Sequence, residues 1–198
     1  MLILGHAGIT LGAAVAVSGV VSTIKPPKSD NPGSNLLSRP SQWLTALANR
    51  IDIRCLLIGA LLPDIIDKPL GYIFFRDSLS SSRSIAHTFF FLIVITLAGL
   101  LLYYLRHKSW LLVVFAGTLA HLSLDQIWLS PQAILWPFSG LAFEQRDMSN
   151  YLGDTFTRLT TDPATYIPEI IGGLILLWFG WEIIKRHRLV PFIKYGKL

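Results

Sequence analysis

Five apolar runs, each near the length that spans a membrane, constrain the fold more than any other feature of the chain. They cover residues 2–24, 51–75, 84–105, 110–129 and 166–184. A helix needs about 20 apolar residues to cross the hydrocarbon core of a bilayer. The runs therefore predict an all-α protein, an integral membrane bundle of about five transmembrane helices.

The amino-acid composition agrees with a membrane protein. Hydrophobic residues make up 52% of the 198 residues and charged residues 15%, against roughly 25% charged residues in an ordinary soluble domain. Most tryptophans lie beside apolar runs, where an interfacial belt would place them. The single cysteine, Cys55, excludes an internal disulfide and a cysteine-rich zinc site. We expect one transmembrane domain over residues 1–198.

The connections between the runs predict the orientation of the bundle. Residues 25–50 form a polar, proline-containing loop in which 43–49 is expected to be a short interfacial helix, residues 130–165 are too long for a simple turn, and the tail 185–198 is basic. Five spans divide the Lys and Arg residues twelve to five between the two sides. The smaller group comprises Lys68, Arg76, Arg83, Arg146 and Arg158. The positive-inside rule then places the N-terminus outside and the C-terminus in the cytoplasm.

The net charge of +5 is explained by this topology. Basic residues on the cytoplasmic side have anionic lipid of the inner leaflet as their natural partner. We therefore expect membrane lipids as partners, no nucleic acid, and a multi-pass location in the inner or plasma membrane.

Two carboxylates interrupt the second apolar run. Asp64 and Asp67 follow Pro63 in the stretch GALLPDIIDKPL at residues 59–70. An ionised carboxylate at hydrocarbon depth is costly and by default marks a functional site. The i, i+3 spacing places both acids on one helix face, or at the two edges of a tight turn if Pro63 ends the helix. Two acids without two basic neighbours call for a cation.

The other ionisable side chains within the runs fall at the same depth. With the topology above, every intramembrane His and Asp lies in the outer leaflet, and the i, i+4 spacing of His121 and Asp125 turns both to one helix face. Mixed nitrogen and oxygen ligands suit zinc best, with iron or manganese as alternatives. We expect one or two ions: six ligands exceed what one tetrahedral zinc needs, whereas two ions about 3.5–4 Å apart would use them all. The candidate metal ligands are His6, Asp64, Asp67, His87, His121 and Asp125.

This ligand set predicts hydrolysis by a metal-activated water. Two metals bridged by a carboxylate stabilise both the attacking and the leaving oxygen of a displacement at a phosphoester. We take Asp67 and Arg83 as the catalytic candidates. Arg83 is i, i+4 from His87 and would either hold a substrate phosphate bidentately or only snorkel to the interface.

Each residue also has a plain structural interpretation. His6 lies between glycines and could serve packing alone, Asp64 could cap a turn after a proline, and Lys68 could pair with Asp67. Clustering of all six candidates in one leaflet favours the metal site. Three acids of the connection 130–165 are expected to be solvated, although one could supply a further ligand or a general acid: Glu144, Asp154 and Asp162.

The ordered combination of short motifs resembles a known family. The motifs are GHAGITLG at 5–12, GALLPDIIDKPLG at 59–71, SRSIAHT at 82–88, HLSLDQIW at 121–128 and WP at 136–137. Together they resemble the membrane-bound metal-dependent hydrolases related to YdjM-like, LexA-regulated inner-membrane proteins. Members of that family often carry a more closely spaced acid pair, and a histidine where this chain has Ser82.

The resemblance implies metal-dependent hydrolysis, and it extends distantly to zinc-dependent phospholipases C. Carried over by position, it implies the same metal ligands as above, with Asp67 as the less direct match. We therefore expect a membrane-embedded hydrolase of a phosphoester or phospholipid headgroup, with residues 130–165 as a lid.

Two other functions stay open. The chain could be a membrane accessory or structural subunit in which a metal, or a polar cluster, ties the helices together. It could also be a metal or proton transporter, although the cytoplasmic halves of four runs contain almost no polar residue to form a path.

Overall fold

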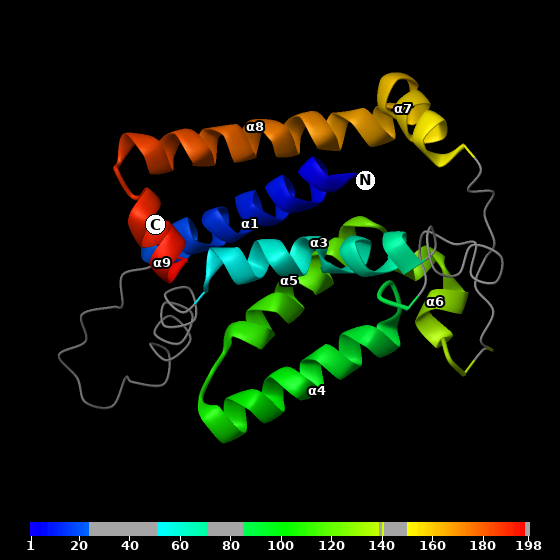
Figure 1. The fold of residues 1–198 in the computed structure, drawn as a ribbon, viewed down its shortest axis with the longest axis horizontal. Coiled ribbons are helices and arrows are strands. Elements are labelled where there is room, and N and C mark those ends of the chain that lie inside the picture. Colours follow the sequence, from blue (N-terminus) through cyan, green and yellow to red (C-terminus); the bar gives the residue numbers. More distant parts are fainter. Residues whose placement is uncertain (24–50, 71–84, 139, 141–149, 197–198) are drawn as a thin grey trace.

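The computed structural model describes residues 1–23, 51–70, 85–138, 140 and 150–196, and within them it contains helices and no strand (Figure 1). The expected all-α class is confirmed for these residues. The predicted interfacial helix at 43–49 and Arg83 lie outside them. The five longest described helices are α1 (Ile3–Thr23), α3 (Ile53–Pro69), α4 (Phe89–Arg106), α5 (Trp110–Leu124) and α8 (Pro163–Lys185). Shorter elements are η2 (Ile127–Leu129), α6 (Pro131–Leu135), α7 (Tyr151–Thr161) and α9 (Leu189–Tyr195).

Local capping sets where these helices begin and end. α3 runs through Pro63, so the two acids lie on one helix and not at a turn. The Thr88 side chain accepts a hydrogen bond from Phe91 N and starts α4, so that His87 precedes the helix instead of lying on it. α5 ends at Leu124, which leaves Asp125 as its C-cap residue. Asp162 caps α8 by accepting from Ala164 N, with Pro163 as the first helical residue.

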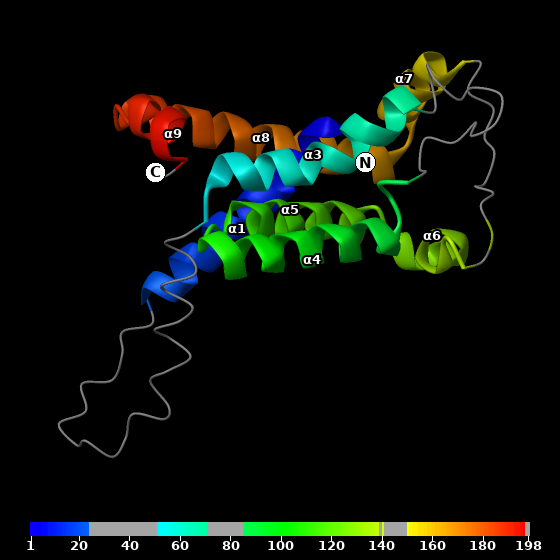
Figure 2. The same cartoon turned by 60° about the horizontal axis from the view of Figure 1, so that its bottom comes forward.

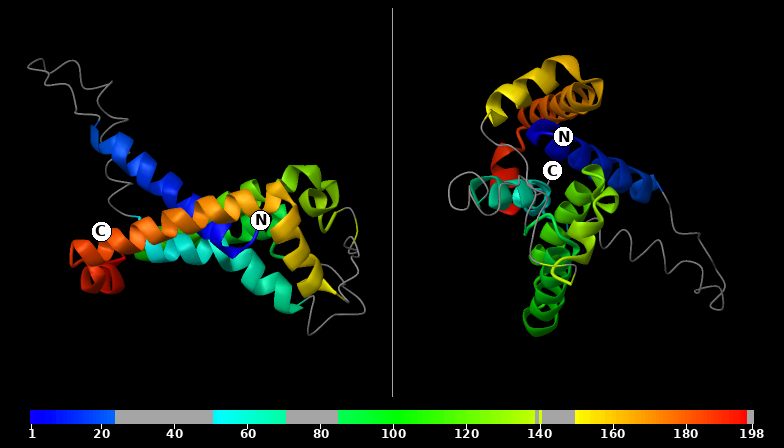
Figure 3. Two further views of the ribbon diagram at one scale, coloured as in Figure 1. Left: turned by 90° about the horizontal axis from the view of Figure 1, so that it is seen from above. Right: turned by 90° about the vertical axis from the view of Figure 1, so that its right-hand side faces the viewer.

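The long helices form a row in which each packs on the next. α8 packs on α1, α1 on α3, α3 on α5 and α5 on α4, as the end-on view also shows (Figure 3). α1, α4 and α8 run in one direction, and α3 and α5 both run in the opposite direction (Figures 1 and 2). The N-terminal ends of α1, α4 and α8 therefore share one end of the bundle with the C-terminal ends of α3 and α5.

Glycine lets two of these contacts reach backbone distance. A methyl group added at Gly8 would overlap the backbone of Gly172 in α8, and one added at Gly59 would overlap the backbone of Val114 in α5. Such close approach is the usual means by which helices pack in a membrane, where no hydrophobic force drives helix association.

Two described helices, α4 and α8, are long and apolar enough to cross a membrane, and α1 and α5 contain shorter apolar stretches. The apolar side chains of α4 point largely outward, for example Leu97, Leu101 and Leu105, which are 61%, 58% and 63% exposed. An apolar surface of this kind needs a lipid or protein partner. The count of five transmembrane helices and their orientation in the membrane stay predictions.

Seven of the nine described Lys and Arg residues lie at one end of the bundle. The other two, Lys68 and Arg158, belong to α3 and α7 at the end where α8 begins. The seven lie at the opposite end, around α9 and the turn between α4 and α5 (Figure 1). They are Arg54, Arg106, Lys108, Lys185, Arg186, Arg188 and Lys194.

At the basic end, α9 is fastened to the start of α3. Ile53 N donates to Gly196 O at 3.0 Å, and the Arg54 guanidinium donates to the Ile193 carbonyl. Arg54 also binds both oxygens of Asp52. The basic tail thus contains a helix that is docked on the start of α3.

Candidate metal centre

Four segments bring ionisable side chains together at the end of the bundle opposite α9. His6 comes from the first turns of α1, Asp64 from α3, His87 from the turn before α4, and His121 from α5. All are buried, with His6 and His121 0% exposed, His87 2% and Asp64 9%. Helices that alternate in direction thus bring together residues that are distant in sequence. This agrees with the prediction that these residues lie at a similar depth along the bundle.

The tautomer of His121 is fixed by a backbone carbonyl. Its Nδ1 lies 2.7 Å from Ala60 O. A carbonyl oxygen only accepts hydrogen bonds, so Nδ1 carries the proton. The remaining ring nitrogen, Nε2, points toward His87 Nε2 at 3.2 Å.

His87 is held in the same tautomer by Asp67. Asp67 Oδ2 lies 2.7 Å from His87 Nδ1 and accepts from His87 N at 3.1 Å, while Oδ1 accepts from Ala86 N at 2.9 Å. The carboxylate already accepts two backbone N–H groups through these oxygens, so Oδ2 also accepts the hydrogen bond that a protonated Nδ1 donates. His87 Nε2 is then left with a lone pair as well.

Two imidazole lone pairs 3.2 Å apart call for a positive species between them. A shared proton would meet this need, and so would a metal ion. Two nitrogen ligands of one tetrahedral zinc, each bonded at about 2.0–2.1 Å, are separated by about 3.3 Å. The observed separation therefore fits neighbouring ligands of a tetrahedral ion.

Carboxylate oxygens approach the same nitrogens. Asp64 Oδ1 lies 3.7 Å from His87 Nε2 and 4.0 Å from His121 Nε2. Asp125 Oδ2 lies 3.8 Å from His87 Nε2, and Asp125 Oδ1 lies 3.1 Å from His6 Nε2. Asp64 and Asp125 thus border the imidazoles from α3 and from the end of α5.

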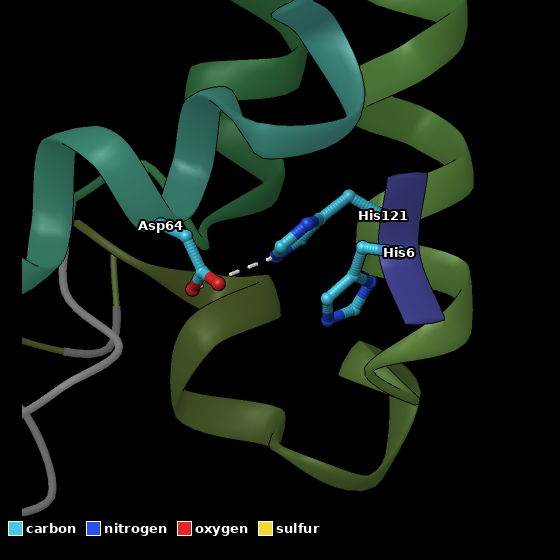
Figure 4. Close-up of side chains that lie close together, drawn as sticks. All are labelled: His6, Asp64 and His121. Atoms are coloured by element: carbon cyan, nitrogen blue, oxygen red, sulfur yellow. Dashed lines mark ion pairs between the residues drawn. The ribbon is translucent and has the colours of Figure 1, made fainter. Parts of the chain in front are cut away.

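His6 stacks on His121 with its ring centroid 3.8 Å away and the two planes 21° apart, and both rings lie beside Asp64 (Figure 4). Within the described residues, neither ring nitrogen of His6 has a hydrogen-bond partner, and Nε2 has only the 3.1 Å contact with Asp125 Oδ1 described above. A buried polar group without a partner costs free energy. A cation bound at this point would supply the partner.

Two overlapping sets of residues have ligand atoms within 4.8 Å of one another. They share His121, which offers one lone pair because its Nδ1 is protonated. The two sets therefore cannot each bind their own ion through three ligands at the same time. The arrangement favours one ion over two complete metal centres. The sets are His6, Asp64 and His121, and His87, His121 and Asp125.

Other predicted residues take different places. Asp67 lies behind His87 and contacts its ring at Nδ1, away from the converging Nε2 atoms. Lys68 binds Asp64 Oδ2 at 2.7 Å, where we had considered a pair with Asp67. Among the loop acids, Asp162 caps α8 and Asp154 accepts from the Asn150 side chain, whereas Glu144 lies outside the described residues.

One buried acid of this region was not singled out from the sequence. Glu169 in α8 is 7% exposed and accepts from the backbone N–H groups of Leu2 and Leu4. The available signal was an acid directly after Pro168 near the start of the fifth apolar run.

A family model described as YdjM inner membrane protein matches residues 1–189 of the chain. Neither a curated protein nor a solved structure gives a significant match.

Proposed function

We propose that this chain, which belongs to the YdjM inner membrane protein family, is a membrane-embedded metal-dependent hydrolase of a phosphoester or phospholipid headgroup. The family assigns the chain to the inner membrane. The hydrolytic activity, the metal, the substrate and the extracytoplasmic side of the site are our proposals.

The observation that carries the proposal is the 3.2 Å approach of His87 Nε2 to His121 Nε2. Both Nδ1 atoms are committed to acceptors, Asp67 for His87 and Ala60 O for His121. Metal-binding histidines typically donate their second N–H to a carboxylate or a backbone carbonyl in this way. In both imidazoles Nδ1 binds an acceptor and Nε2 faces the other ring. This shared arrangement supports a metal site better than it supports a chance cluster of polar side chains.

We assign the metal to His87 and His121, with one or two further ligands drawn from Asp64, Asp125 and His6, so that a tetrahedral ion keeps a position for water. Zinc suits this set, and iron or manganese would also bind it. When bound, such an ion lowers the pKa of a coordinated water and polarises a phosphoryl oxygen. We propose that Asp67 keeps His87 oriented, in place of the roles of direct ligand and catalytic group predicted from the sequence. Arg83 stays a prediction for substrate binding.

Position and charge support a lipid or phosphoester substrate. The site lies at the end of the bundle opposite seven of the nine described Lys and Arg residues, so the positive-inside rule would turn it outward. Lys68 is 26% exposed beside Asp64 and supplies positive charge at the edge of the cluster. Exposed apolar side chains at the same end, including Trp128 at 57% and Phe138 at 91%, suit contact with lipid.

A structural metal in a non-catalytic accessory subunit is the second candidate. The ligand side chains are 0–11% exposed, and structural zinc sites are closed whereas catalytic ones keep an open position. Transport is disfavoured, because toward the basic end α1 and α8 meet in an apolar cluster of Leu11, Phe179 and Ile183.

The first test is elemental analysis of purified protein without a histidine tag, expressed as metal per chain. We expect about one ion, which His121→Ala and Asp64→Ala each remove, whereas Glu182→Ala at the far end of α8 retains it. Full metal content in both site variants, or no metal after reconstitution, would refute the site.

Activity separates the two candidates. A panel of phosphodiesters and phospholipids in mixed micelles should reveal hydrolysis that is lost in His121→Ala and retained in Glu182→Ala. A stoichiometrically bound metal without turnover of any substrate would favour the accessory subunit.

A further inference from the structure

The buried acid of α8, Glu169, has no role in the function proposed above. It is 7% exposed within a helix that is long and apolar enough to cross a membrane. An ionised carboxylate at such a position is costly and is retained where it is compensated and used. Its contacts indicate what it does.

Glu169 binds the start of another helix. Its carboxylate oxygens accept from Leu2 N at 2.5 Å and from Leu4 N at 3.0 Å. The first N–H groups of a helix have no partner within that helix, and the helix dipole favours negative charge beside them. Glu169 therefore caps α1 from α8, in place of a cap provided by the chain next to α1.

Close packing leaves this capped turn little freedom. A methyl group added at Gly5 would lie 2.5 Å from Glu169 Oε1, and one added at Gly8 would overlap the backbone of Gly172. The first turns of α1 are thus fixed against α8 both by hydrogen bonds and by backbone contact.

His6 lies within these turns. Its backbone N donates to Leu2 O at 3.3 Å, the residue whose own N–H is held by Glu169. The His6 ring has no hydrogen bond of its own among the described residues, so it is located by the path of α1, by stacking on His121 at 3.8 Å and by the 3.1 Å contact of its Nε2 with Asp125 Oδ1. Displacement of the first turn would therefore move the ring relative to the other ligands.

We propose that Glu169 is a positioning residue of the metal centre, whose carboxylate caps α1 from α8 and thereby places His6 beside His121. This inference rests on the proposed metal site for its functional consequence. It makes α8, which provides none of the proposed ligands, a necessary part of the site.

The experiment is a double-mutant cycle on metal affinity, with Co²⁺ as a spectroscopic probe of the full chain in detergent. Loss of an outer partner of a metal ligand typically lowers affinity about 10–100-fold, and we expect Glu169→Ala to do so and to alter the visible Co²⁺ bands. The Co²⁺ affinity of Glu169→Gln should lie between that of Glu169→Ala and that of the unmodified chain, because its amide offers one oxygen to two N–H donors. Glu182→Ala, which removes an acid from the same helix, should bind as the unmodified chain does.

The cycle distinguishes positioning from a general loss of stability. If Glu169 acts through His6, then Glu169→Ala should have little further effect in a His6→Ala background. Equal fold-losses in both backgrounds, or unchanged affinity in the single variant, would overturn the inference.

A second measurement does not depend on metal. Hydrogen exchange in the peptide covering residues 1–11 should accelerate in Glu169→Ala, whereas peptides of α5 should not change. Unchanged exchange would overturn the capping role itself. If the unmodified chain binds no Co²⁺ but Glu169→Ala still accelerates exchange in residues 1–11, the proposed function would be refuted. The inference that Glu169 caps α1 would then still hold.

Discussion

Asp67 and His87 form a buried pair in which Oδ2 of the acid lies 2.7 Å from Nδ1 of the ring. The same carboxylate accepts from the backbone N–H groups of residues 86 and 87, so it fixes the chain and the ring together. Because the pair turns His87 Nε2 toward His121 at 3.2 Å, the Asp67 carboxylate determines which nitrogen of His87 faces the neighbouring imidazole.

Replacement of Asp67 by Asn should weaken metal binding without removing a ligand. The amide keeps the size of the acid, but it loses the charge that holds His87 Nδ1 protonated. We expect zinc affinity to fall about 10–100-fold with the number of bound ions unchanged, measured by titration against a competing chelator. Asp154→Asn, a change at an exposed site on α7, is the control. A fall in the number of ions would show that Asp67 binds the metal directly, as the sequence alone had predicted.

Removal of the metal should lower thermal stability. A ligand that binds the folded chain at 100 times its dissociation constant contributes about 2.7 kcal/mol, which for a chain of this size corresponds to a shift of roughly 5–10 °C in the unfolding midpoint. We expect chelation to lower the midpoint in detergent by this amount and added zinc to restore it. His121→Ala should show no response to zinc. A zinc-dependent shift of equal size in that variant would contradict the site.

The helices and the clustering of the site were predictable because both follow from polarity along the chain. An apolar run indicates a helix, and a His or Asp within it is conspicuous. Since successive long helices alternate in direction, position within each run was enough to bring His6, Asp64, His87, His121 and Asp125 to one end of the bundle.

The roles of individual acids depend on the path of the backbone, which the pattern does not contain. Asp67 and Asp64 share a helix face, but only Asp67 accepts from the backbone of the turn at Ala86 and His87. Asp64 lies instead beside Nε2 of the His87 ring. Glu169 was missed because the contact that explains it joins residues 165 and 167 positions apart. The ends of α4 and α5 likewise depend on short-range caps at Thr88 and Asp125.

The contact between α3 and α5 should be intolerant of any side chain at Gly59. An added methyl group would overlap the backbone of Val114, which cannot move aside as a flexible side chain does. The contact also carries the hydrogen bond from His121 Nδ1 to Ala60 O. We expect Gly59→Ala to destabilise the protein by about 1–3 kcal/mol and to lower metal affinity.

A matched control is available in α8. Gly180 has no atom within 4 Å of an added methyl group, so Gly180→Ala should leave stability in detergent unchanged or slightly raised. Equal behaviour of the two variants in unfolding experiments would show that α3 and α5 do not approach as closely as described.

The orientation of the bundle can be tested at two exposed positions that flank α8. Thr157 lies on α7 at the end that carries the site, and Arg188 lies between α8 and α9 at the basic end. Because α8 separates them and is long enough to cross a membrane, single cysteines at the two positions should lie on opposite sides. In a Cys55→Ser background, we expect a membrane-impermeant maleimide to label Thr157→Cys in intact spheroplasts and Arg188→Cys only after lysis. The reverse pattern would place the metal centre on the cytoplasmic side, against the positive-inside rule, and would exclude an outer-leaflet substrate.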